Sequence, residues 1–282
     1  MTFEGCNMSR DRTATLIRLG LVLALAFVVH ALMPLAPAKA AVRLLPPGEI
    51  MKVPGEEPYI PPQEAPKEEP KPPSQLEKVR IAVADGDAGK LEGLVARNAP
   101  YEIVAPSAKP DLVWDPKTRN VNAGSAVVSY DVGVADLGAV IDRTAVVNAL
   151  TQRAASRRQS IRFDTANRLY HKGEAIQVLV DGVVGRALLL VDIAGDGQTQ
   201  LIFPGVADTP IPAASPYSLG LTVGQPFGTD VMVAITSAQP IAALEQRMKE
   251  ARPTDAPEFL ALLDKNMPQD ARIGLLTLSS AP

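Results

Sequence analysis

This 282-residue sequence contains few of the side chains that cysteine- or histidine-based catalysis requires. Its histidines are His30 and His171, and its one cysteine is Cys6. His171 lies in the segment Tyr170-His171-Lys172-Gly173, which is typical of a turn between strands. A catalytic triad would also need a serine presented beside the histidine, and the sequence contains no Gly-x-Ser-x-Gly elbow. We therefore interpret His171 as a solvated turn residue and predict no catalytic residues of this kind.

Carboxylates at short spacing occur in the segment Asp192-Ile193-Ala194-Gly195-Asp196-Gly197. Calcium-binding loops have oxygen ligands at such spacing, but here no acidic residue closes the loop. The segment is also typical of a hairpin turn, in which Gly and Asp adopt backbone conformations that other residues avoid. We predict the turn; a calcium site would need Asp208 or Asp230 to fold in. The sequence also lacks the glycine-rich phosphate-binding motifs, so we predict neither a metal nor a cofactor.

Arginines gather in one stretch of the sequence, from Arg153 to Arg168. The guanidinium group matches carboxylate and phosphate in geometry, so these residues are candidates for binding a small anionic ligand or a partner. The alternative is a solvated helix end, where cations are favoured by the helix dipole. The candidate site residues are Arg157, Arg158, Arg162 and Arg168.

The N-terminus has the features of an export signal. Arg10, Arg12 and Arg18 precede an uncharged run from Leu19 to Ala38, and the small residues of Ala38-Lys39-Ala40 form a cleavage site. We predict a signal peptide over residues 1–40 and a protein of the periplasm or the extracellular medium. The alternative is an uncleaved membrane anchor, because about 20 apolar residues can span a bilayer.

Removal of residues 1–40 would leave a mildly acidic chain without cysteine. Lys and Arg would fall from 28 to 24 and Asp and Glu from 31 to 29, so the net charge would be 24 − 29 = −5. Such a surface, with no block of Lys or Arg, argues against binding to nucleic acid or to anionic membranes. A membrane contact is expected only if the signal segment remains attached.

Residues 41–76 are predicted to be a disordered linker. Ten prolines lie between Pro46 and Pro73, interspersed with Glu and Lys. This composition has too few apolar side chains to form a core and favours an extended chain. The segment could serve as a spacer or be a leader left after processing.

The remaining sequence predicts an α+β fold in two parts. Residues 77–156 have the pattern of a small β/α domain, with helical spacing around Leu91–Val95 and a longer helix from Asp136 to about Ala154. Residues 157–282 have the pattern of a β-sandwich-like domain with two short helices, near 242–249 and 257–263, inserted before the last strand. The apolar run Arg186–Ile193 is typical of a strand buried on both faces.

Several different short motifs follow one another between Tyr170 and Ile241. They are Tyr170–Glu174, Leu188–Asp192 followed by Gly195-Asp196-Gly197, Leu201–Pro204, Phe227–Asp230 and Ser237–Ile241. With these motifs, the segment from Phe163 to Leu278 resembles a domain family of unknown function that is attached to the C-terminal side of bacterial caspase-like peptidases. The resemblance implies an accessory module with no settled activity, ligand or cofactor. It does not bring a peptidase, which would need a cysteine thiolate and a histidine base.

These observations predict an exported cell-envelope accessory or binding protein without catalytic activity. Its partner would be another envelope protein or a ligand, held at sheet edges or at the Pro-rich loop Phe203–Pro216. The alternative is a carboxylate-based hydrolase that uses neither Cys nor His. Such an enzyme needs a deep pocket with convergent carboxylates of perturbed pKa, whereas an adaptor needs only an exposed edge or apolar patch.

Overall fold

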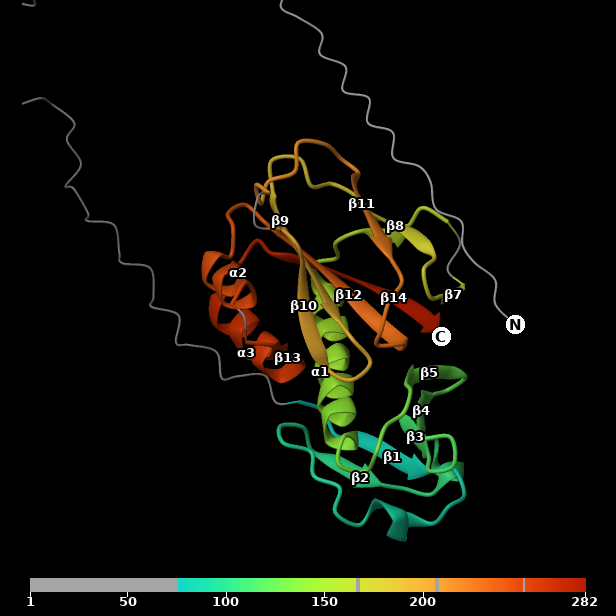
Figure 1. Ribbon diagram of the computed structural model, residues 1–282. Coiled ribbons are helices and arrows are strands. Elements are labelled where there is room, and N and C mark those ends of the chain that lie inside the picture. Colours follow the sequence, from blue (N-terminus) through green and yellow to red (C-terminus); the bar gives the residue numbers. More distant parts are fainter. Residues whose placement is uncertain (1–75, 166–167, 206–207, 251) are drawn as a thin grey trace, which may run out of the picture. The chain divides into compact units, whose positions relative to one another are not determined.

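The described part of the chain has the α+β fold that the sequence predicts. The computed structural model describes residues 76–282 apart from 166–167, 206–207 and 251, and all of them belong to one compact unit of the chain. The predicted signal peptide and all but the last residue of the predicted linker lie outside the described residues. Within the described ranges, three α-helices accompany a mixed sheet of eleven strands and an antiparallel sheet of three strands (Figure 1).

The first half of the mixed sheet consists of five short strands in the order β2-β1-β3-β4-β5. Strand β1 is parallel to β2 and β3, and the other pairs are antiparallel. Alternate residues of β1 and β3, such as Ile81 and Trp114, point into one apolar cluster. The strands are β1 Val79–Val83, β2 Tyr101–Ile103, β3 Leu112–Asp115, β4 Asn120–Ala123 and β5 Ala126–Ser129.

The prediction of a helix around Leu91–Val95 was wrong. The chain forms a 3-10 turn there, Ala88–Leu91, in which the Gly89 N–H donates to the Asp87 carboxylate. Gly93 follows with φ of 86°, a left-handed conformation that does not continue a right-handed helix. A second 3-10 turn covers Pro106–Ala108.

Three longer strands lie at the centre of the second half of the mixed sheet. Strand β12 (Gly228–Ser237) lies between β9 (Ala187–Ile193) and β14 (Arg272–Ala281) and is antiparallel to both. A pairing of Gly228 with Ser129 of β5 joins the two halves into one sheet. Three further strands extend this half: β10 Gln198–Phe203 beside β9, β13 Thr254–Asp255 beside β10, and β7 Leu169–His171 beside β14.

The small sheet covers one face of these long strands. Its order is β11-β8-β6, with β6 at Ile161–Phe163, β8 at Ala175–Val180 and β11 at Tyr217–Thr222. Its apolar side chains, such as Val178, lie in one cluster with Leu188 and Leu190 of β9.

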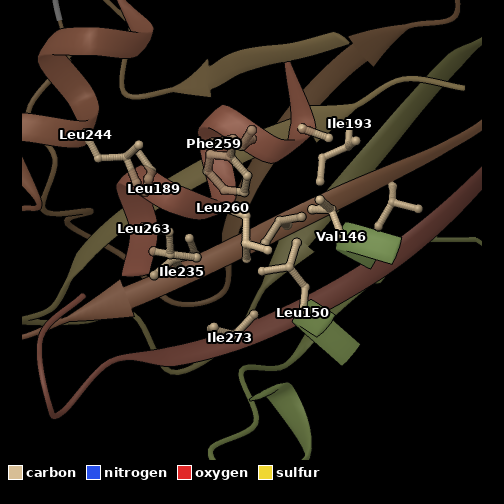
Figure 2. Close-up of a cluster of buried hydrophobic side chains, with 14 of the residues drawn as sticks. Val146, Leu150, Leu189, Ile193, Ile235, Leu244, Phe259, Leu260, Leu263 and Ile273 are labelled. Atoms are coloured by element: carbon tan, nitrogen blue, oxygen red, sulfur yellow. The ribbon is translucent and has the colours of Figure 1, made fainter. Parts of the chain in front are cut away.

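The helices cover the opposite face. Figure 2 shows side chains of all three helices, including Leu150, Leu244 and Phe259, packed on Leu189 and Ile235 of the sheet. The helices are α1 Leu137–Ser156, α2 Ala242–Met248 and α3 Ala256–Asn266, so α2 and α3 precede the last strand as predicted. Helix α1 begins after Asp136, although that carboxylate accepts a hydrogen bond from the Gly133 N–H and not from the helix.

Strand β9 is buried on both faces, which confirms the prediction for its apolar run. Its odd-numbered residues, such as Leu189 and Val191, face the helices, and its even-numbered residues Leu188 and Leu190 face the small sheet. The next even-numbered position is Asp192, and this change from leucine to aspartate places an acid at the edge of an apolar interior.

Candidate functional site: a pocket between the two sheets

A pocket of about 620 Å³ opens where the small sheet and the mixed sheet diverge. Its apolar wall includes Ile176 of β8, Met232 of β12 and Leu278 of β14. Its polar side includes three carboxylates, those of Asp192, Asp196 and Asp230. The pocket is bounded by the chain from Gln198 to Ile202 and from Leu221 to Pro226, and by Glu250 and Arg252 near β13.

The strand register brings Asp192 and Asp230 to the same face. Asp192 pairs with Met232 across the ladder between β9 and β12, and Asp230 precedes Met232 by two residues. Residues two apart on a strand share a face, so Asp192 and Asp230 are diagonal neighbours, at about 7–8 Å between Cα atoms. Gln200 of β10 pairs with Asp192 on its other side and therefore faces the same space.

Burial changes the acidity of both carboxyls. It raises the pKa of Asp192 to about 7, and the negative charge of Asp230 adds to this rise. Burial likewise raises the pKa of Asp230 to about 6, opposed by the charge of Arg143 and by a hydrogen bond from the Gly195 N–H at 3.3 Å. The Oδ1 atom of Asp192 is buried without a hydrogen-bond partner among the described residues. Near neutral pH the pair therefore retains part of one proton.

Arg143 of α1 supplies the nearest compensating charge. Its side chain lies at the ends of β9 and β12, where Nε donates to the Ala194 carbonyl at 3.1 Å and Nη2 donates to the Thr229 carbonyl at 2.5 Å. Burial lowers the pKa of Arg143, while the charges of Asp230, Asp192 and Asp196 act in the opposite direction. The guanidinium thus ties two strand ends together and places a buried cation behind the acidic pair.

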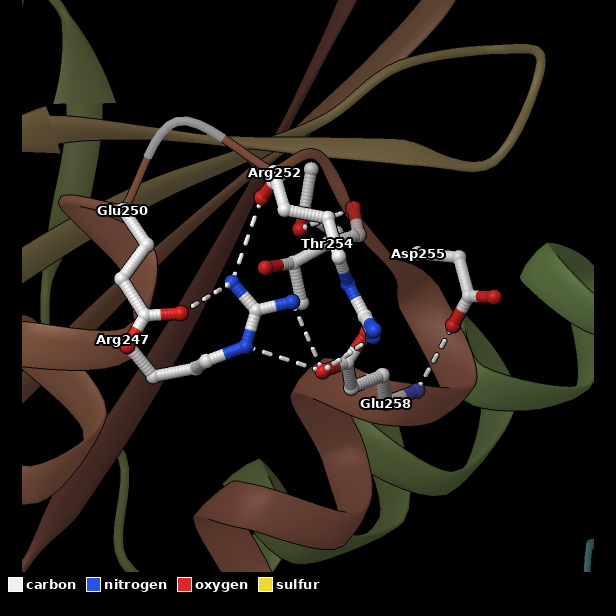
Figure 3. Close-up of polar contacts among 7 residues, drawn as sticks. Arg247, Glu250, Arg252, Thr254, Asp255 and Glu258 are labelled. Carbon is white, nitrogen blue, oxygen red and sulfur yellow. Dashed lines mark hydrogen bonds and ion pairs between the residues drawn. The ribbon is translucent and has the colours of Figure 1, made fainter.

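The rim of the pocket beside α2 and α3 is a network of ion pairs (Figure 3). Glu258 accepts from Arg247 Nε at 3.0 Å and from Arg252 Nη2 at 2.9 Å, and Arg247 also pairs with Glu250 at 3.3 Å. Thr199 Oγ1 donates to the Thr254 carbonyl at 2.7 Å and so fixes this segment to β10. Because the rim arginines already have carboxylate partners, they do not neutralise Asp192 and Asp230.

The arginines singled out from the sequence lie apart from this pocket. Arg162 pairs with Asp181 at 3.5 Å, and Arg168 pairs with Glu174 at 2.8 Å. Arg168 also lies over the Tyr170 ring, 4.5 Å from its centroid.

The other two follow the end of α1. The carbonyl of Arg157 accepts from the Ile273 N–H at 3.0 Å, and the backbone of Arg158 forms an isolated parallel β-bridge with Ile273. Arg158 lines a second hollow of about 590 Å³ with Ser160 and Leu275. The four candidates are therefore distributed over three places.

The acidic segment behaves in part as the sequence indicated. Gly195–Gly197 forms the turn between β9 and β10, with Gly197 at φ of 88°. Asp230, one of the two acids that could complete a calcium site, approaches this turn and accepts a hydrogen bond from the Gly195 N–H. Among the residues that the structure describes, no group of three or more His, Cys, Asp or Glu is arranged to hold a metal ion.

Sequence reasoning missed the pairing of Asp192 with Asp230 and the role of Arg143. One signal was available for each. Asp192 interrupts the apolar run of a strand buried on both faces, and Arg143 is, with Asp142, a charged residue among the buried and mostly apolar positions of α1. His171 is an exposed residue at the end of β7, paired with β14.

The chain was compared with family models, curated proteins and solved structures, and none of the three comparisons found a match. The likeness to the modules of caspase-like peptidases thus remains a prediction. Over the described ranges, the helices are too short or too polar to cross a membrane.

Proposed function

We propose that this chain is an exported cell-envelope accessory protein that binds a ligand or partner and does not catalyse a reaction. The observation that carries this proposal is the pocket between the two sheets, in which apolar walls surround a few polar groups. Ligand sites in proteins have this composition, with the apolar wall providing affinity and the polar groups orienting the ligand.

The pocket is better suited to binding than to catalysis. The described residues that line it include no histidine, tyrosine or tryptophan, so they offer neither an imidazole base nor an aromatic platform for a sugar ring. The Thr199 hydroxyl donates to a main-chain carbonyl, and Arg252 is held by Glu258. These groups are engaged in the fold and do not point toward a reacting atom.

A carboxylate-based hydrolase is the second candidate, and one observation favours it. Asp192 and Asp230 lie in the same pocket with pKa values raised to about 7 and about 6, as a proton-sharing pair that activates water requires. A panel of ester, glycoside and peptide substrates would test it. Turnover that is present in the wild type and in Asp164→Asn, but absent in both Asp192→Asn and Asp230→Asn, would establish the enzyme and exclude the accessory protein.

The two-part organisation belongs to the same proposal. Residues 77–156 would form a small β/α domain and residues 157–282 a β-sandwich-like domain with two inserted helices. The separate apolar clusters support this division, since one lies among β1–β5 and the start of α1 and another lies between the two sheets. Residues 1–40 would direct export and residues 41–76 would tether the folded part. The chain would be the accessory half of a caspase-like system without its peptidase.

Binding is tested by closing the pocket without disturbing the core. Gln200 is exposed and faces Asp192, so Gln200→Trp would fill the opening. The matched control is Gln177→Trp, since Gln177 is an exposed residue of β8. Tagged chains would be crosslinked in intact envelopes, and the recovered chain would be sequenced from its N-terminus.

We expect a reproducible partner or ligand with the wild type and the Gln177→Trp control, loss of it with Gln200→Trp, and a chain that begins at Ala41. Equal recovery from both variants would remove the pocket from the proposal. A chain that still carries residues 19–38 would replace export by membrane anchoring.

A further inference from the structure

We infer that the pocket between the sheets binds one alkylammonium cation, a primary amine on an apolar stem, between Asp192 and Asp230. This inference rests on the proposed binding function and names the chemical class of its ligand.

The buried charges around the pocket do not balance. Asp192 and Asp230 face the cavity, and Asp196 adds a third carboxylate at the turn. Arg143 is the cation among the described residues whose charge acts on both members of the pair. One guanidinium offsets one carboxylate, so the second needs either a proton or a cation from outside, because an isolated buried charge is unfavourable.

The position of Arg143 leaves room for that second cation. Its Nε and Nη2 atoms donate to the carbonyls of Ala194 and Thr229, at the strand ends. In the hydrogen bonds that the structure shows, Asp230 accepts from the Gly195 N–H, and Asp192 Oδ1 accepts from none of the described residues. The hydrogen bonds of Arg143 thus go to main-chain carbonyls, and neither carboxylate of the pair accepts from its guanidinium.

The surroundings match an ammonium group on an aliphatic stem. An ammonium has three N–H donors and no acceptor. Two carboxylates and the amide oxygen of Gln200, which faces the same space, can accept all three. Beyond them the wall is apolar, with Ile176, Met232 and Leu278 available to pack against methylene groups. A carboxylate or phosphate ligand would instead meet like charges.

The proton and the amine compete for the same place. Because burial raises the pKa of Asp192 to about 7, acid protonates the pair and removes the charge that holds the cation. The other charged groups facing the pocket are Asp196 from the β9–β10 turn and Glu250 and Arg252 at the rim. Arg143 from α1 acts on the pair from behind it. Affinity for an amine should therefore rise as the pH increases from about 5.5 to about 8.

Calorimetric titration of the purified chain with n-butylamine, 1-butanol and butyrate tests the inference. We expect butylamine to bind at least about tenfold more tightly than the neutral or anionic analogue, since only the amine carries the complementary charge. Asp192→Asn should lose at least about tenfold of this affinity and its pH dependence, whereas Asp164→Asn, at an exposed acid outside the pocket, should keep both. The peptide acetyl-Ala-Lys-Ala-amide is titrated in parallel. Binding of this peptide would identify the ligand's ammonium group as a lysine side chain of a partner, and binding of butylamine alone would identify it as a free small amine.

Equal affinities for butylamine and 1-butanol, or unchanged amine binding in Asp192→Asn, would overturn the inference. A partner that is lost only in Gln200→Trp would in that case leave the proposed binding function standing. Circular dichroism of Asp192→Asn shows whether the variant is folded. If it is not, Gln200→Trp provides the second test, because it blocks the opening and should also abolish amine binding.

Discussion

At single positions around the pocket, the stability of the fold and the binding of a ligand favour different side chains. Asp192 occupies a position that would hold an apolar side chain if stability alone decided, since its neighbours Leu188 and Leu190 on the same face are almost fully buried. Buried acids with raised pKa values cluster at functional sites because folding disfavours them elsewhere. Removal of the carboxylate of Asp192 should therefore raise the free energy of unfolding and weaken ligand binding.

The first prediction concerns the stability of Asp192→Asn as a function of pH. A carboxyl has a pKa of about 3.9 in an unfolded chain, and burial raises that of Asp192 to about 7. The folded state thus binds more protons between these values, so the contribution of Asp192 to stability is greatest below about pH 4 and is lost as the pH rises through about 7. Asparagine cannot ionise and does not incur this loss.

We therefore expect Asp192→Asn to be on the order of 1–3 kcal/mol more stable than the wild type near pH 8, with little difference below about pH 4. Urea denaturation at a series of pH values measures this difference, with Asp164→Asn as the reference. A constant difference between Asp192→Asn and wild type across the range would mean that Asp192 does not titrate in this way.

How far the site was predictable depends on the residue. Asp192 must point to the same face as Leu188 and Leu190, because alternate residues of a strand share a face, and the sequence indicates the strand. The approach of Asp230 does not follow in this way, because it depends on the register between β9 and β12, which local sequence does not specify. Arg143 reaches main-chain carbonyls 51 and 86 residues away, and no local pattern predicts such contacts.

Among the elements, the turn between β9 and β10 has a second task besides shaping the pocket. It packs against β5, where an added Cβ on Gly195 would lie 2.1 Å from the Val128 carbonyl oxygen. Gly228 approaches the same oxygen, at 2.3 Å from its would-be Cβ. Glycine is required at these positions because two main chains meet there, and the contact joins the two halves of the mixed sheet.

The second prediction follows from this contact. Gly195→Ala should destabilise the protein by about 1–3 kcal/mol, because the backbone of β5 or of the turn must move. The matched control is Gly224→Ala: a Cβ there meets no atom within 4 Å, and loss of backbone freedom in the unfolded chain should leave the stability unchanged or slightly higher. Thermal unfolding of the two variants measures the contrast. Equal melting temperatures would show that β5 and the turn are not in contact as the structure shows.

The elements themselves were largely predictable where their apolar pattern was long and periodic. The helix after Asp136, the strand buried on both faces and the two helices before the last strand all appear where expected. The helix expected at Leu91–Val95 does not form, because Gly93 adopts φ of 86° between Leu91 and Leu94, and this left-handed conformation ends the helical turn despite the apolar spacing.

Across the whole molecule, helix α1 is the element that both halves share. Its first part packs with the cluster around β1 and β3, through Leu137 and Ile141, and its second part packs with the cluster of β9 and β12, through Val146 and Leu150. Between the two halves of the sheet, the described strands meet where Gly228 pairs with Ser129 and Thr229 Oγ1 donates to the Val127 carbonyl. Sequence patterns identify the apolar face of such a helix but do not show that it serves two clusters.

The third prediction is that the two halves unfold together. Trp114, the sole tryptophan, reports on the first half, where it is buried and its Nε1 donates to the Val132 carbonyl at 3.0 Å. In denaturant, its fluorescence and the far-ultraviolet circular dichroism of the sheets should change at the same midpoint, since a shared helix couples the clusters.

Leu150→Ala extends the test, because Leu150 belongs to the second half of α1 and packs in the second cluster, whereas Trp114 packs in the first. Loss of this buried side chain should lower the free energy of unfolding by about 2–5 kcal/mol, and the tryptophan signal should report the same loss as the dichroism. Gln152→Ala, at an exposed position of the same helix, should shift neither midpoint by much. If Leu150→Ala moves the dichroism transition and leaves the Trp114 transition in place, the halves are independent domains that meet only at one strand pair. Coincident shifts would instead make α1 the connection through which occupancy of the pocket can stabilise the first half, because ligand binding raises the stability of every element that unfolds with the site.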